Sequence, residues 1–271
     1  MPPLKTLALA GAIAAAVAAC ATTTSPTGRT QVVGGVSQQE LNNLGAQAFA
    51  EVKAQKRQSN DPRQTREVQC IVSAIVRQLP PGWQGNWETA VFVDNEPNAF
   101  ALPGGKVGVY TGIFTVARDQ NQLAGVISHE IGHVISRHHE ERITRQMGAQ
   151  GAVELIGAVL GSRYGEGAAT AARQGGSVLA QTGFLLPGSR EQESEADVVG
   201  QQLMAQAGFD PRGAVMLWEN MIAASNNSRP PQWLSTHPNP ENRIRELQQR
   251  AASLMPVYEE ARAAGRRPSC G

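Results

Sequence analysis

The sequence predicts an α+β fold that is mainly helical and carries a small β-sheet. Apolar residues recur at helical spacing behind capping residues over most of the chain, and two short β-rich runs lie at 91–93 and 107–110. With 271 residues, of which 41% are hydrophobic, the chain can bury one large core or two small ones. A disordered tail protein is therefore excluded.

The first two helices are predicted from caps and proline pairs. Ser37 and Glu40 form a capping box for a helix that reaches about Lys56. A second helix opens at the Asp-Pro pair 61–62 and stops before the Pro-Pro pair 80–81. Their apolar positions are Leu41, Leu44, Ala48 and Val52 in the first helix, and Val68, Ile71, Val72, Ile75, Val76 and Leu79 in the second.

The two β-rich runs enclose the stretch 98–105, so a small sheet is expected there. Asp119 and Gln122 then cap a long helix that is expected to reach about Arg145. Its core-facing positions are Leu123, Ile127, Ile131 and Val134.

Residues 148–188 hold 10 of the 28 glycines, and we expect loosely packed helices or a mobile lid in this stretch. The remaining predicted helices are one that Ser189 and Gln192 cap and that ends at Gly208, one over 211–224 and one over 241–254.

Residues 1–19 read as an export signal, because one lysine precedes a short uncharged apolar run. The run ends in small residues before Cys20 and resembles the lipobox of bacterial lipoproteins, which implies cleavage before Cys20 and lipid attachment to its sulfur. Ala21 in the next position favours the outer membrane. An ordinary signal peptide is the alternative. The predicted domains are the signal peptide 1–19, a tether 20–29, a folded body 30–255 and a tail 256–271.

The charge balance argues against a nucleic-acid partner. The chain has 24 basic and 23 acidic residues, and removal of the signal with its Lys5 leaves 23 of each.

If the chain is exported, Cys70 and Cys270 meet an oxidising compartment. There they either form a disulfide or remain a buried thiol and a cysteine at a frayed chain end.

A metal-binding pattern lies within the long predicted helix. His129 and His133 are four residues apart and share one helix face, and Glu130 stands beside them as a base. The same helical arithmetic directs His138 and His139 away from this face, so both are expected at a solvated helix end and not at the metal.

A catalytic zinc site needs a third protein ligand. Glu193 and Asp197 are four residues apart on a later helix and can act together as ligand and orienting carboxylate, whereas Glu195 points the opposite way. Small Ala196 would allow close approach of the two helices. A solvated acidic face is the alternative.

These motifs resemble the zinc metalloproteases of the HtpX and CaaX-prenyl-protease family. The resemblance rests on the motif 129–133, on Glu193 and Asp197, on the stretch 98–105 and on the downstream segment 235–243, and it covers roughly residues 28–250. Since no membrane span is visible, the lipid-anchored, single-domain periplasmic branch fits better. The resemblance implies a zincin-like α+β domain.

The resemblance also implies roles for individual residues. One Zn²⁺ per chain would be held by His129, His133 and Glu193, while Glu130 would take a proton from the activated water and Asp197 would orient a histidine. The remaining implied residues are His237 and Arg243 at the developing oxyanion, and Asn98, Ala99, Phe100 and Ala101 along an extended substrate.

His237 has two alternative interpretations. Its imidazole could bind the metal itself and hold the enzyme inactive, or it could pack as a loop residue beside Trp233.

The function expected from this is zinc-dependent cleavage of misfolded or unassembled envelope proteins by a lipid-anchored, periplasm-facing enzyme. Two alternatives remain open. The chain could be a periplasmic chaperone or assembly factor with a vestigial metal site, or it could be a metal-dependent hydrolase that acts on the cell wall. The sequence does not indicate an oligomeric state.

Overall fold

The computed structural model describes residues 21–148, 189–225, 237 and 242–271. The described residues form two compact units. The smaller unit consists of residues 21–38 and 139–148, and the larger unit consists of residues 39–138 and the described residues from 189 onward. The predicted signal peptide and Cys20 lie outside the described residues, and so does the glycine-rich stretch after Gly148.

The smaller unit contains a β-hairpin where a tether was expected. Strand β1 (Ala21–Thr24) pairs antiparallel with β2 (Thr30–Val33), and Gly28 adopts a positive φ of 89° in the turn. Part of the predicted tether 20–29 therefore belongs to a β-hairpin. β-branched threonines favour an extended backbone, and the pairing with β2 satisfies their main-chain groups. In the same unit, Arg29 forms an ion pair with Glu141 at 2.8 Å.

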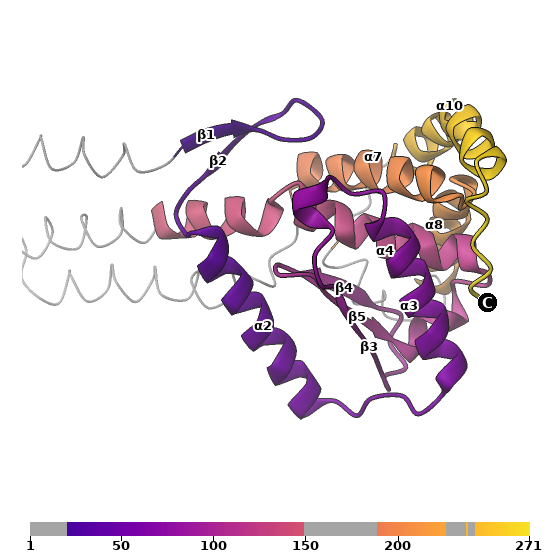
Figure 1. Cartoon of the computed structure of the whole chain (residues 1–271), viewed down its shortest axis with the longest axis horizontal. Helices are drawn as coiled ribbons and strands as arrows, with labels where there is room; N and C mark the ends of the chain where they lie inside the picture. Colours follow the sequence, from indigo (N-terminus) through magenta and orange to yellow (C-terminus); the bar gives the residue numbers. More distant parts are fainter. Residues whose placement is uncertain (1–20, 149–188, 226–236, 238–241) are drawn as a thin grey trace, which may run out of the picture. The chain divides into compact units, whose positions relative to one another are not determined.

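The larger unit is built around a three-stranded sheet of order β3-β5-β4 (Figure 1). The central strand β5 (Lys106–Tyr110) runs parallel to β3 (Glu88–Phe92) and antiparallel to β4 (Ala99–Leu102). Both predicted β-rich runs contribute to it, and β4 comes from the stretch between them. Helix and sheet together confirm the predicted α+β class.

One face of this sheet carries an aromatic cluster beneath α2 (Gln38–Gln55). The rings of Phe49, Phe92, Phe100 and Tyr110 lie with centroids 6.1–6.3 Å apart. Gly108 faces Phe100 across the strands, and a Cβ on Gly108 would lie 2.2 Å from that ring. A residue without a side chain is therefore required at this position.

Helix α2 itself is confirmed, but its predicted apolar face is partly wrong. Leu41, Gly45 and Phe49 are buried, whereas Leu44 is 39% exposed. Gly45 lies against the backbone of Pro103, and this contact fixes the rotation of α2 about its own axis. Only a residue without a side chain permits so close an approach. A pattern of apolar residues cannot reveal such a contact.

The opposite face of the sheet packs against α3 (Pro62–Val76) and α4 (Gln120–Ile135). Asp61 and Asp119 cap these helices through side-chain oxygens, as predicted. The predicted apolar positions of both helices are buried. Helix α4, however, ends ten residues earlier than expected, because Arg137 adopts a positive φ of 57° before helical residues 138–148.

Three further helices complete the larger unit: α7 (Arg190–Ala207), α8 (Arg212–Ser225) and α10 (Arg243–Ala263). The capping box of Ser189 and Gln192 is present, and Gly208 ends α7 in the left-handed conformation. Helix α4 packs against α7 and α8, and α10 packs on both of these (Figure 1). No helix within the described ranges combines the length and apolar character that a membrane crossing needs.

Helix α10 runs to Ala263, although the sequence placed its end near Leu254. Pro256 lies inside the helix and removes one backbone donor without ending it. Ala261, beyond the proline, is fully buried, so packing offsets the lost hydrogen bond. Part of the predicted tail 256–271 is thus helical.

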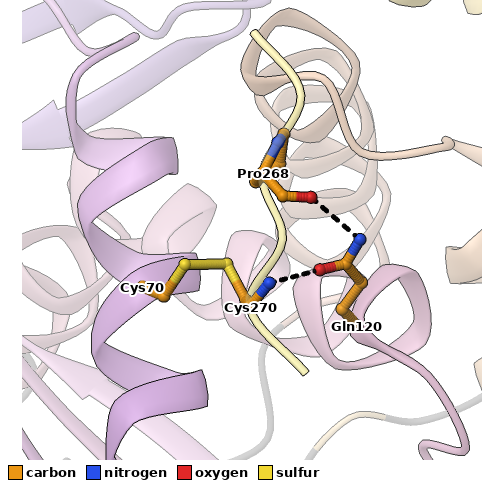
Figure 2. The surroundings of a disulfide bond; sticks show 4 residues. All are labelled: Cys70, Gln120, Pro268 and Cys270. Carbon is orange, nitrogen blue, oxygen red and sulfur yellow. Dashed lines mark hydrogen bonds between the residues drawn. A yellow bond between two sulfur atoms is a disulfide. The ribbon is translucent and has the colours of Figure 1, made fainter.

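The last residues of the chain are fixed to α3 and α4 (Figure 2). Cys270 forms a disulfide with Cys70 of α3, with 5.5 Å between the two Cα atoms. The side-chain amide of Gln120, at the start of α4, donates to the carbonyl of Pro268 and accepts from the backbone N–H of Cys270. Of the two alternatives for these cysteines, the structure contains the disulfide.

Candidate metal centre

Close packing of α4 on α7 brings the predicted ligands together. A Cβ on Gly132 would lie 2.9 Å from the carbonyl of Ala196, and one on Gly200 would lie 2.9 Å from the backbone nitrogen of His129. Small residues on both helices therefore set the distance between them. The expectation that Ala196 lies at a close helix contact agrees with this geometry.

Four side chains converge between these helices. His129, His133, Glu193 and His237 each present one ligand atom, and these atoms lie within 4.8 Å of one another. His129 Nε2 lies 3.1 Å from His133 Nε2 and 3.4 Å from Glu193 Oε2. The first three side chains are buried, and that of His237 is 13% exposed.

The geometry and the donor set fit a zinc ion. Ligand atoms about 2.0–2.1 Å from a tetrahedral zinc stand roughly 3.3–3.4 Å apart, which is close to the separations found here. Glu193 Oε1 is buried without a hydrogen-bond partner in the described chain, and it lies 3.4 Å from His133 Nε2. A cation between these atoms would satisfy that oxygen.

Asp197 and Arg243 stand behind the first histidine. His129 Nδ1 donates to Asp197 Oδ1 at 2.9 Å, so its Nε2 faces the other ligands. Arg243 is 1% exposed, donates to Asp197 at 2.7 Å and lies 3.6 Å from the centroid of the Trp218 ring. Its second nitrogen lies 3.4 Å from Glu193 Oε2. These contacts favour a positioning role for Arg243, and its predicted role at the oxyanion remains a prediction.

The electrostatics of the site favour anionic carboxylates. Burial raises the pKa of Asp197, but the charge of Arg243 and the hydrogen bond from His129 outweigh burial and lower it. Burial also opposes ionisation of Glu193, yet the surrounding imidazoles of His133, His237 and His129 hold its pKa well below the usual value.

The two helix histidines differ in their protonation. Burial lowers the pKa of His129, but hydrogen bonds to Asp197 and Glu193 raise it to about 9. Burial holds the pKa of His133 well below the usual range. In the absence of metal these shifts favour a protonated His129 and a neutral His133.

Glu130, the predicted base, lies beside this cluster and is buried. Its Oε1 is 3.4 Å from His237 Nε2, while His237 Nδ1 is 3.0 Å from Glu193 Oε2. His237 thus lies between the predicted base and the third predicted ligand. Its distance of 3.3 Å from His129 Nε2 is compatible with the hypothesis that it binds the metal.

The predicted substrate residues Asn98, Ala99, Phe100 and Ala101 lie on or next to β4. This strand is an edge of the three-stranded sheet, and it packs against α4. The carbonyl of Asn98 accepts from the backbone N–H of Tyr110, and the side chains of Ala99 and Ala101 are buried.

Two histidines that follow α4 in the chain differ from the prediction. His138 and His139 are 0% and 8% exposed, so the prediction of a solvated helix end is wrong. His138 Nδ1 lies 2.8 Å from His133 Nδ1, and its Nε2 lies 3.1 Å from Glu195 Oε2. The prediction assumed one straight helix, whereas the break at Ser136 and Arg137 turns His138 back toward His133.

The HExxH motif on α4, the glutamate that converges on it from α7 and the small sheet beside them are the arrangement that a metallopeptidase with a catalytic zinc would use. The model of peptidase family M48 matches residues 62–251, and the chain belongs to this family. Zinc is accordingly its cofactor.

Several curated proteins are similar to this chain. Mitochondrial metalloendopeptidase OMA1 of Schizosaccharomyces pombe is 40% identical over 164 residues, which cover 60% of this chain and 46% of the relative. OMA1 of Saccharomyces cerevisiae is 30% identical, with coverages of 65% and 50%. The beta-barrel assembly-enhancing protease of Escherichia coli K12 is 32% identical, with coverages of 62% and 35%. The matched region thus spans between about a third and a half of each relative.

Proposed function

We propose that this metalloendopeptidase cleaves misfolded or unassembled proteins of the bacterial cell envelope. The observation that carries the proposal is the position of Glu130, which lies beside a buried cluster of two histidines and a glutamate. A purely structural zinc site has no use for such a base. The similarity to the beta-barrel assembly-enhancing protease of Escherichia coli supports an envelope substrate.

In this proposal His129, His133 and Glu193 hold the metal. When bound there, zinc polarises the peptide carbonyl and lowers the pKa of a water molecule. Glu130 takes the proton of the attacking water and passes it to the leaving amine. His237 is the candidate donor to the developing oxyanion, because its ring lies next to both Glu130 and the ligands.

Strand β4 provides the proposed site for the substrate backbone. Among the described strands only β5 pairs with β4, so its second edge offers main-chain groups for an extended peptide. The side chains of Ala99 and Ala101 are buried, as is usual for residues on the inner face of a sheet. Recognition through main-chain hydrogen bonds suits an enzyme that accepts many unfolded sequences.

We further propose that the protein is exported and anchored by lipid at Cys20, facing the periplasm from the outer membrane. This is the lipoprotein branch of the HtpX-like enzymes to which the motifs pointed. The disulfide between Cys70 and Cys270 supports export, since disulfides persist in oxidising compartments. No nucleic-acid partner is proposed.

The test compares digestion of an unfolded protein, reduced casein, by the wild type and by Glu130→Gln, together with the zinc content of both. Glutamine keeps the shape of glutamate but cannot accept the proton. We expect Glu130→Gln to retain zinc and to lose at least about a hundredfold in the rate of cleavage. Equal digestion by both proteins would overturn the mechanism.

The second candidate function is a periplasmic chaperone or assembly factor. The contact of His237 with both Glu130 and Glu193 favours it, because an imidazole that remained on the metal would block catalysis. Wild-type protein that binds zinc, fails to cleave casein and suppresses its aggregation would support this candidate. His237→Ala would then be expected to gain cleavage.

A further inference from the structure

A buried chain of three side chains leads away from the metal cluster. His133 Nδ1 lies 2.8 Å from His138 Nδ1, and His138 Nε2 lies 3.1 Å from Glu195 Oε2. The side chain of His138 is 0% exposed and that of Glu195 is 2% exposed. Polar groups this deeply buried are costly unless they are paired, so the hydrogen bonds along the chain are strongly favoured.

The protons along this chain can be assigned from chemistry. A metal ion on His133 Nε2 requires that nitrogen to be without a proton, which leaves the proton on Nδ1. His133 Nδ1 then donates to His138 Nδ1, and His138 must carry its own proton on Nε2. That nitrogen donates to the carboxylate of Glu195, which accepts. The three side chains are therefore consistent with a single arrangement of protons.

The backbone shows why these residues meet. Helix α4 ends at Ile135, and the left-handed conformation of Arg137 turns the following residue back over the preceding turn. The rings of His133 and His138 consequently lie with centroids 4.8 Å apart. Glu195 comes from α7, the helix that also carries Glu193 and Asp197.

We propose that His138 and Glu195 are positioning residues, which fix the tautomer and orientation of His133 for zinc. Helix α7 then supplies one carboxylate to each ligand histidine, Asp197 directly to His129 and Glu195 through His138 to His133. This inference deepens the proposed function and rests on its zinc site. It acts on zinc binding, so its test does not depend on proteolysis.

The experiment measures the zinc dissociation constant of the full chain by competition with a chromophoric chelator. His138→Phe keeps a ring in the cavity but removes both nitrogens. We expect it to weaken zinc binding about tenfold to a hundredfold. His138→Asn, whose carbonyl oxygen can replace Nδ1 as acceptor, should recover most of the affinity. The matched control is His139→Phe, the same change at the adjacent buried histidine, which should leave the affinity within about twofold.

Glu195→Gln guards against a variant that does not fold, because it changes no heavy-atom position. We expect a several-fold loss of zinc affinity in the wild-type background and no further loss in His138→Phe, because the two residues act through one chain of hydrogen bonds. A lower free energy of unfolding of the zinc-free protein with unchanged zinc affinity would show that the pair only joins α7 to α4. That result, or equal effects of Glu195→Gln in both backgrounds, would overturn the proposal.

Discussion

At the scale of single residues, the carboxylate of Asp197 connects a proposed zinc ligand to a buried cation. It accepts from His129 Nδ1 at 2.9 Å and from Arg243 at 2.7 Å. The negative charge of Asp197 makes the imidazole a stronger donor to the metal. The charge of Arg243 and the hydrogen bond from His129 together lower the pKa of this carboxylate, because their combined effect outweighs that of burial.

Asp197→Asn should therefore weaken zinc binding by about tenfold, because the amide retains a hydrogen bond but loses the charge. The chelator competition described above measures this effect. Asp94→Asn is the matched control, since it removes a carboxylate that pairs with Lys56 on a different part of the unit. Equal zinc affinity of Asp197→Asn and the wild type would contradict the role given to Asp197.

The converging histidines and glutamate were predictable because a helix places residues four apart on one face. The same rule misplaced His138, since it holds only while the helix continues. No glycine or proline marks the break at Arg137, and the left-handed conformation of an arginine is not visible in a sequence. The contacts of His138 and Glu195 therefore cannot be predicted from the spacing of residues in the sequence.

At the scale of elements, the contact between α4 and α7 decides whether the ligands converge. Gly200 on α7 lies against the backbone of α4 at His129, and backbone atoms cannot move aside as a side chain can. Added atoms at such a contact cause strain or separate the helices. The position of Glu193 relative to His129 therefore depends on a glycine two turns along α7.

Gly200→Ala should lower the free energy of unfolding by about 1–3 kcal/mol. It should also weaken zinc binding, because α7 must shift away from the histidines. Chemical denaturation and chelator competition measure the two effects. Gly82→Ala is the matched control, since a Cβ there meets nothing within 4 Å. Equal free energies of unfolding for Gly200→Ala and Gly82→Ala would contradict this role of the contact between α4 and α7.

Helix starts were the most predictable elements, because Asp61, Asp119 and Ser189 cap through local hydrogen bonds. Ends that depend on tertiary contacts were less predictable. Helix α10 passes Pro256 because later residues are buried, and β1 forms because β2 pairs with it. Neither the burial of the residues after Pro256 nor the pairing of β1 with β2 can be predicted from the local sequence.

At the scale of the whole molecule, the disulfide links residues 200 positions apart and ties the end of the chain to α3. Closing so long a loop restricts the unfolded chain more than the folded one. The chain also spans only a third to a half of its relatives, although it carries the complete set of proposed zinc ligands.

The most direct test of the account follows casein cleavage while zinc is removed and restored. Protein stripped by a chelator should lose its activity, and titration with zinc should restore it in proportion to added metal, with saturation at one equivalent per chain. His133→Ala should remain inactive at the same zinc concentrations. Cleavage by the stripped protein, or by His133→Ala with one equivalent of zinc, would contradict a zinc centre built from these residues.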